Sequence, residues 1–185
     1  PSSINAWLAG QNVSTSAKSI EDACKDALAI TRKRINDIFK VKGSVPVDFY
    51  HRELGEIMIN RCGISRNKDG LIAGMKEVKI LQDQFYHGVR IPSAVDGLNP
   101  ELEKALKVAD FLELAQLMLT DALAREESCG AHFREEHQTL EGEAMRDDQN
   151  YSHIAAWEYV KGGKPIKHLE ALLFTNLKST SRSYK

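Results

Sequence analysis

Residues 99–127 read NPELEKALKVADFLELAQLMLTDALAREE and carry the clearest helical pattern of the chain. Asn99 and Pro100 form a strong start signal, because a capping residue precedes a proline at the first helical position. Apolar residues then recur at alternating spacings of three and four, and a second apolar row lies beside the first. We therefore predict a helix from about 100 to 127 at the centre of a helical bundle. The first row is Ala105, Val108, Leu112, Ala115, Leu119 and Ala122, and the second is Phe111, Leu114 and Met118.

Three more helices are predicted upstream of this one. The first runs from about 17 to 40, before Gly43 and Pro46. The second begins near Asp48 and ends near Gly63, and residues 65–70 form a turn. The third runs from about 71 to 90, before Pro92. The expected inward residues are Ile20, Cys24, Ala27, Leu28, Thr31, Ile35 and Ile38 in the first helix, Leu54, Ile57 and Met58 in the second, and Leu71, Met75, Val78, Leu81 and Phe85 in the third.

The pattern changes after residue 128, where glycines interrupt the chain and no apolar stripe of helical period continues. Residues 154–160 and 169–177 are two short apolar runs on either side of Gly162-Gly163-Lys164-Pro165. They are compatible with a β-hairpin, although runs of this length do not distinguish a strand from a helix. We predict a mainly α fold, an antiparallel bundle of three to four helices followed by an irregular C-terminal extension with this hairpin.

Three regions follow from these patterns. Residues 1–14 are expected to be a linker, residues 15–128 the helical bundle, and residues 129–185 the C-terminal extension. Trp7 on the linker is expected to dock on another surface, because an exposed tryptophan on a tail is unusual. The chain begins Pro1-Ser2-Ser3 without an initiator methionine, which suggests a piece of a longer protein.

Composition excludes several classes of function. The chain has 185 residues and a formal net charge of -1, so no basic field indicates a nucleic acid or a membrane surface. No apolar run approaches the roughly 20 residues that cross a bilayer. Cys24, Cys62 and Cys129 are widely spaced and odd in number, which favours free thiols in a reducing compartment.

Residues 125–134, Arg-Glu-Glu-Ser-Cys-Gly-Ala-His-Phe-Arg, are too dense in charge for a core and too irregular for an ordinary solvated helix face. His132 and His137 invite a metal interpretation, but five residues of separation place them about 140° apart on a helix. A charged, partly exposed segment is favoured. The carboxylate pairs at 126–127, 135–136 and 147–148 are usually solvated, and the last could cap a helix or form a salt bridge. We treat Cys129 as structural or incidental, because the sequence shows neither an oriented base nor an oxyanion site.

The same residues carry a family resemblance. They are similar to the E-S-R-G-A-H-x-R … R-D-D signature near the C-terminus of the succinate dehydrogenase and fumarate reductase flavoproteins. We call residues 125–151 the signature segment. The matching positions are Glu127, Ser128, Gly130, Ala131, His132, Arg134, Arg146, Asp147 and Asp148, with Arg125 at a position that is often basic, Tyr151 where Trp or Phe is common, and Arg182-Ser183-Tyr184 like the R-S-Y ending. Cys129 departs from the family, which usually has arginine there.

The resemblance implies a C-terminal helical domain of a parent enzyme that interconverts succinate and fumarate through FAD. The implied partners are its own flavin domain, an iron–sulfur subunit and a membrane anchor subunit, which pass electrons to a quinone. The implied location is cytoplasmic, peripheral on the inner face of the bacterial membrane. The family's FAD-binding, flavin-linking and substrate-binding residues match nothing here, so we expect no catalytic, cofactor or metal residue on this chain and no activity from it alone.

The resemblance also implies a mechanical role for the signature segment. Arg134 and Arg146 are expected to pair with carboxylates and His132 to donate to a carbonyl, in a contact with the rest of the subunit or a partner. Two alternatives stay open. One is the similar C-terminal bundle of L-aspartate oxidase, although Arg146-Asp147-Asp148 favours the succinate and fumarate branch. The other is a free-standing helical interaction module. Self-association is expected if the apolar surface lacks its neighbour.

Overall fold

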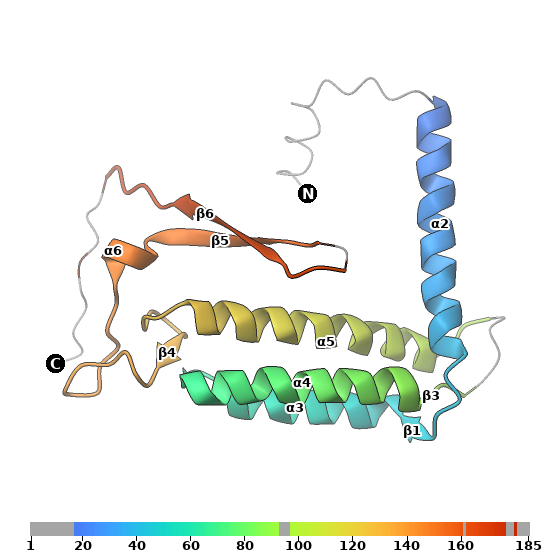
Figure 1. Ribbon diagram of the computed structural model, residues 1–185, viewed down its shortest axis with the longest axis horizontal. Helices are drawn as coiled ribbons and strands as arrows, with labels where there is room; N and C mark the ends of the chain where they lie inside the picture. Colours follow the sequence, from blue (N-terminus) through green and yellow to red (C-terminus); the bar gives the residue numbers. More distant parts are fainter. Residues whose placement is uncertain (1–16, 93–96, 161, 177–179, 181–185) are drawn as a thin grey trace.

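The computed structural model describes residues 17–92, 97–160, 162–176 and 180, so the expected linker 1–14, Trp7 and the Arg182-Ser183-Tyr184 ending lie outside the described residues. Three helices form the bundle: α3 (Val47–Cys62), α4 (Lys68–Gly88) and α5 (Pro100–Ala124). Consecutive helices run in opposite directions (Figure 1). Each of the three contacts the other two. The predicted fold class, a mainly α bundle with a C-terminal extension, is confirmed.

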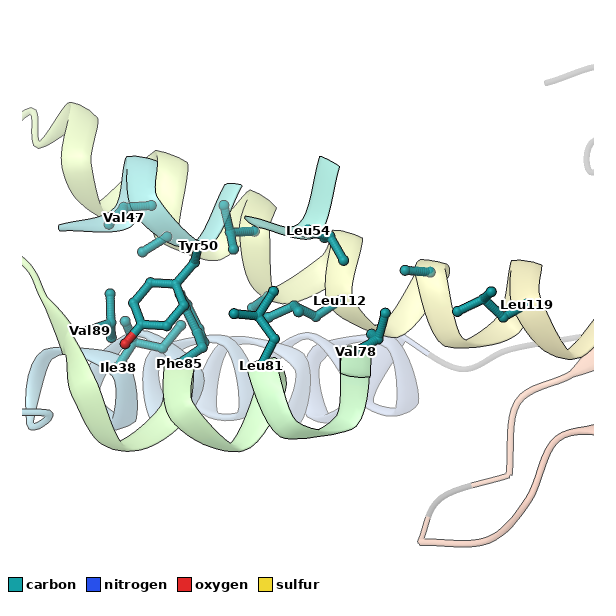
Figure 2. Packing of buried hydrophobic residues seen from close by; sticks show 14 of the residues in the cluster. Ile38, Val47, Tyr50, Leu54, Val78, Leu81, Phe85, Val89, Leu112 and Leu119 are labelled. Atoms are coloured by element: carbon teal, nitrogen blue, oxygen red, sulfur yellow. The ribbon is translucent and has the colours of Figure 1, made fainter. Parts of the chain in front are cut away.

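The core is the apolar interior that these helices share. All six residues of the first apolar row of α5 are buried, as predicted. Leu71, Val78, Leu81 and Phe85 of α4 meet this row, together with Val47, Tyr50 and Leu54 of α3 (Figure 2). The alanines of α5 let neighbouring helices approach closely, and the larger side chains fill the space between them.

Tyr50 shows how the core accommodates a polar atom. Its ring packs edge-on against Phe85, with the ring centroids 5.3 Å apart. Its hydroxyl donates to the carbonyl oxygen of Gln84 at 3.0 Å, so burial leaves no unpaired group at this position.

The second apolar row of α5 is only half buried. Phe111, Leu114 and Met118 are 42%, 52% and 48% exposed. They line the edge of the interior beside α3, and among the described residues no further helix covers them. An apolar pattern shows that a residue can be buried, but the number of neighbouring helices determines whether it is.

The predicted N-terminal helix is confirmed as α2 (Ala17–Phe39), which projects away from one end of the bundle (Figure 1). The prediction that its apolar stripe is inward is wrong for most of its length. Ile38 is buried and Ile35 is partly buried, whereas Ile20 and Leu28 are 52% and 50% exposed. The end of α2 is held by Arg34, whose Nη2 lies 2.5 Å from Oδ1 of Asp110 on α5.

Short parallel pairs close both ends of the bundle. At one end, β1 (Val45–Pro46) pairs with β3 (Val89–Arg90), beside a close backbone approach at Gly43. A Cβ atom at Gly43 would lie 1.9 Å from the carbonyl oxygen of Gly88, so glycine is required. At the other end, β2 (Ser65–Arg66) pairs with β4 (Phe133–Arg134).

Two helix boundaries differ from prediction. Asn99 caps α5 as expected, its Oδ1 accepting from the Leu102 amide at 3.1 Å, but α5 ends at Ala124 and not at 127. Residues 65–70 are not a plain turn. Asn67 caps α4 by accepting from the Gly70 amide at 2.8 Å, so α4 begins at Lys68. The side-chain cap makes the earlier start favourable.

The C-terminal extension contains α6 (Asp148–Tyr151) and the predicted hairpin. The hairpin consists of β5 (His153–Glu158) and β6 (Ile166–Ala171), which are antiparallel with Trp157 opposite Lys167. The second strand begins at 166 and not at 169. The indole Nε1 of Trp157 donates to Asp121 of α5 at 2.7 Å, which ties the hairpin to the bundle. Among the described residues, none of the helices has the length and apolarity to cross a membrane.

The two apolar rows of α5 provide a matched test. Replacing Leu112, which is fully buried, with alanine should lower the free energy of unfolding by about 2–5 kcal/mol, because it leaves a cavity. Replacing Leu114 with alanine should change it by within about 0.5 kcal/mol. Urea denaturation followed by circular dichroism measures both, and equal losses would contradict this description of the core.

Candidate functional site

The signature segment begins where α5 ends, at a helix terminus whose last carbonyl groups need donors. Arg134 supplies them. Its Nη1 donates to the carbonyl oxygens of Ala122, Leu123 and Arg125 at 3.0, 3.3 and 3.3 Å. The guanidinium also suits the negative end of the helix dipole. Arg134 is only 1% exposed, so its charge is turned into this domain and is not available to a partner.

The backbone around Arg134 is fixed by Ser128, which is fully buried. Ser128 Oγ accepts from the Arg134 amide at 2.8 Å and donates to the Arg134 carbonyl oxygen at 3.1 Å. On the other side, β4 pairs with β2, and the Phe133 amide donates to the Ile64 carbonyl oxygen at 3.1 Å. The α3–α4 connection and the end of α5 are thereby joined through one short segment.

Glu135 and Glu136 bind the start of α4. Glu136 Oε1 accepts from the Lys68 amide at 2.5 Å, while Glu135 accepts from the side chains of Ser65 and Asn67, each at 2.9 Å. Carboxylates suit the positive end of a helix dipole. The three residues 134–136 therefore place a cation at the C-terminus of α5 and anions at the N-terminus of α4, and Arg134 Nε lies 3.2 Å from Glu136 Oε2.

Residues 129–132 form a tight turn. The amide of each end residue donates to the carbonyl oxygen of the other, Cys129 to His132 at 2.8 Å and His132 to Cys129 at 3.1 Å. Gly130 has φ of 59°, a left-handed conformation that favours glycine. His132 Nε2 lies 2.9 Å from the Arg125 carbonyl oxygen, which can only accept, so the imidazole donates as the sequence suggested.

Glu127 links the end of α5 to the later part of the signature segment. It is 2% exposed, and its Oε1 accepts from Arg125 Nε and Nη2 at 2.8 and 2.5 Å. Its Oε2 accepts from the Asp147 amide at 2.9 Å. Arg125 also donates to the Tyr151 carbonyl oxygen at 3.1 Å, with the Tyr151 ring centroid 6.0 Å away. Glu126, the sequence neighbour of Glu127, is exposed. Of this carboxylate pair, one member is therefore buried and the other is in solvent.

Arg146, Asp147 and Asp148 build the start of α6. Asp147 caps the helix by accepting from the Asn150 amide at 3.2 Å, and Arg146 Nη2 lies 2.5 Å from Asp148 Oδ1. Both uses of this acidic pair, a helix cap and a salt bridge, were open alternatives in the sequence. Nearby is a cleft of about 470 Å³, lined by Glu126, His137, Met145, Arg146, Asp147, Asn150 and Tyr151.

The structure brings most of the predicted site residues together around two helix ends. In the described ranges no group of three or more His, Cys, Asp or Glu residues could hold a metal ion. Sequence reasoning missed the roles of Glu135 and Glu136 at α4, of Asn67, and of Arg66, which donates to the carbonyl oxygens of Gly63 and Ala131. The available signal for the α4 cap was Asn67 shortly before an apolar run, with Asp69 in the first turn.

A family model described as the fumarate reductase flavoprotein C-term matches residues 51–184, which contain α4, α5 and the signature segment. The chain belongs to this family.

Several curated proteins with similar sequences carry the same family description. The fumarate reductase flavoprotein subunit of Escherichia coli strain K12 is 27% identical over 177 residues, which are 95% of this chain and 28% of that protein. The subunit of Proteus vulgaris is 29% identical over 166 residues, 87% of this chain and 27% of that protein. The chain thus spans little more than a quarter of the length of these relatives.

Solved structures share the architecture. A quinol-fumarate reductase with menaquinol molecules aligns with a TM-score of 0.73 at 25% identity, over 92% of this chain and 28% of that one. Mycobacterium smegmatis Sdh1 in complex with UQ1 aligns with a TM-score of 0.68 at 18% identity, over 80% of this chain and 24% of that one. At 18% identity, the similarity to Sdh1 indicates a shared fold only.

Removing the Arg134 side chain should leave the carbonyl groups at the end of α5 without a hydrogen-bond donor. We expect Arg134→Ala to lower the free energy of unfolding by on the order of 3 kcal/mol, because buried acceptors lose their donor. Arg134→Lys should be intermediate, since an ammonium lacks the planar fork. Arg146→Ala, at a more exposed ion pair, should cost no more than about 1 kcal/mol. Equal losses for Arg134→Ala and Arg146→Ala in urea denaturation would contradict this assignment.

Burial lowers the pKa of His132. The hydrogen bond to the Arg125 carbonyl opposes this shift, while the nearby guanidinium groups of Arg66, Arg134 and Arg125 add to it. The unfolded chain therefore binds more protons at this residue than the folded chain in mildly acidic solution. Stability from His132 should be fully present above about pH 6.5, the ordinary imidazole pKa, and should fall as pH decreases through the lowered folded pKa.

The measurement compares the pH dependence of unfolding for the wild-type chain and for His132→Gln, which keeps a neutral donor near the Arg125 carbonyl. The difference between the two curves should show wild type losing stability relative to the variant on acidification. Parallel curves would show that His132 does not titrate differently in the folded state.

Proposed function

We propose that this chain acts as the C-terminal helical domain of an FAD-dependent succinate dehydrogenase or fumarate reductase flavoprotein subunit. In this role it braces the flavin domain while succinate and fumarate are interconverted elsewhere in the subunit. The observation that carries the proposal is the family match over residues 51–184. Within this range, residues of the signature segment form hydrogen bonds with the ends of α5 and α4. These residues supply architecture, so we assign no catalytic step and no FAD contact to them.

The exposed stripe of α2 supports a contact with the flavin domain. Ile20 and Leu28 are half exposed, and α2 contacts the bundle mainly through the end that carries Arg34 and Ile38. An isolated helix gains little stability without tertiary packing, so a projecting amphipathic helix is suited to a neighbouring surface. In the proposed enzyme, the flavin domain is the neighbour that would cover this stripe of α2.

The outward groups of the signature segment support a second contact. Arg134 and Glu127 are directed inward, whereas Glu126 and Met145 remain exposed beside the cleft at α6. In the proposed complex this surface faces the iron–sulfur subunit, and a membrane anchor subunit receives the electrons for a quinone. The complex would lie on the cytoplasmic side of the bacterial membrane.

The succinate and fumarate branch is preferred over L-aspartate oxidase. Arg146, Asp147 and Asp148, which favoured this branch in the sequence, form one structural unit at α6. The relatives compared above are fumarate reductase flavoproteins. The flavoprotein role also accounts for the apolar surface of α2, which a free-standing module would leave exposed.

The α2 contact can be tested in the full-length flavoprotein that contains this domain. Replacing Ile20 and Leu28 together with glutamine should weaken the domain contact by on the order of 3 kcal/mol, through the loss of apolar burial. Flavin content per subunit and succinate-dependent dye reduction should then fall together.

The matched control replaces Lys25 and Lys33, which are exposed on other faces of α2, with glutamine. These substitutions should leave flavin content and dye reduction near wild type. If the Ile20 and Leu28 variant also kept both, α2 would not brace the flavin domain. A full-length protein without flavin or dicarboxylate activity even as wild type would overturn the proposed function itself.

A further inference from the structure

A cleft lies between the hairpin and the bundle, on the side of α5 turned toward β5. Its volume is about 410 Å³, within the range of small-ligand sites. One wall comes from α5 with a contribution from α4, and the other comes from β5 and the hairpin turn. The lining residues are Gln82 of α4, Asp110, Glu113, Leu114, Gln116 and Leu117 of α5, and Trp157, Tyr159, Val160, Gly163 and Pro165 of the hairpin.

One hydrogen bond attaches the hairpin wall of the cleft to α5. The Trp157 indole is tied to Asp121 by the 2.7 Å hydrogen bond from Nε1, which sets the distance between β5 and α5. Leu114 and Leu117 of α5 face Val160 and Pro165 across the space. A ligand with an apolar body can bury it between these two walls.

The polar lining offers acceptors. Gln116 uses its Nε2 to donate to the Met75 carbonyl oxygen at 2.7 Å, which leaves its amide oxygen for another donor. The Glu113 side chain is exposed, and among the described residues its carboxylate forms no ion pair or side-chain hydrogen bond. Asp110 carries a second carboxylate, which is paired with Arg34.

Among the described residues no cation pairs with Glu113, including Lys164, which stands between the lining residues Gly163 and Pro165. Arg34 is engaged by Asp110, and Lys167 lies 5.8 Å from the centroid of the Trp157 ring. Lys79 contacts Gln82 and Asp83. Among the described residues that line the cleft, none is Lys, Arg or His. A ligand that donates hydrogen bonds and carries positive charge complements this lining, and the ring of Tyr159 adds a face that attracts cations.

We propose that this cleft binds an organic cation with an apolar body, an alkyl- or arylammonium or guanidinium group whose charge pairs with Glu113. The apolar body lies between the Leu114–Leu117 wall and the hairpin. This site is separate from the signature segment, and its occupancy does not depend on the redox reaction proposed for the parent enzyme.

The test is a titration of the chain with phenethylammonium, followed through the indole N–H resonance of Trp157 by NMR and assigned with Trp157→Phe. The matched probe is 3-phenylpropionate, which has the same aromatic body and the opposite charge. Phenethylammonium should shift the resonance saturably, and 3-phenylpropionate should bind at least about fivefold more weakly.

Glu113→Gln should weaken phenethylammonium binding by about fivefold, because it removes the charge and keeps the shape. The control is Glu103→Gln on the same helix, where the carboxylate pairs with Lys107 outside the cleft and binding should be unchanged. Equal binding of both probes, or equal effects of the two substitutions, would overturn the proposal.

A second titration identifies the source of the cation. An acetylated Leu-Arg-Leu amide peptide presents a guanidinium group between apolar side chains. If the peptide binds more tightly than phenethylammonium, the proposed site is supported and its natural ligand is a polypeptide. If phenethylammonium binds more tightly, the site is supported and its natural ligand is a small amine. Binding of neither probe would overturn the proposal.

Discussion

The contact between the Arg134 guanidinium and the last carbonyl groups of α5 is the constraint on which the C-terminal half of this domain depends. A buried cation is unfavourable unless it is fully paired, and here the partners are three backbone oxygens and a carboxylate. Because Glu135 and Glu136 follow directly and bind the start of α4, one tripeptide satisfies opposite ends of two antiparallel helices. The turn at Gly130 and the buried Ser128 hydroxyl then bring the chain back to place Arg134 at this position.

The side chains of the signature segment fall into two groups with different roles. Its inward groups, Arg134, Ser128 and Glu127, hold the domain together, and its outward groups lie beside the cleft at α6. Cys129 occupies the turn through its backbone, so the chain closes this turn without the arginine that the family usually has there. Exposed apolar side chains on α2, on the outer row of α5 and on the hairpin form surfaces that a neighbouring domain could cover.

Much of the bundle could be predicted because helix signals are local. The Asn99 cap and the inner row of α5 were correct at every residue, since a cap and a 3.6-residue period depend on nearby sequence. The half exposure of the outer row, Phe111, Leu114 and Met118, could not be predicted, because sequence does not give the number of neighbouring helices. The end of α5 was placed three residues late because its terminus is satisfied by Arg134, a residue beyond the helix. The carboxylates at 135–136 were recognised as a pair, but their role depends on the α4 terminus, which is distant in sequence and adjacent in space.

Hydrogen exchange followed by mass spectrometry tests most directly whether Arg134 joins the signature segment to the bundle. Wild type should protect the last turn of α5 and the amides of Ser128 and Asp147, which donate to Met145 and Glu127. In Arg134→Ala these amides should lose protection together, while the amides around Leu81 and Leu112 in the core stay protected. Unchanged protection of Ser128 and Asp147 in the variant would contradict the account.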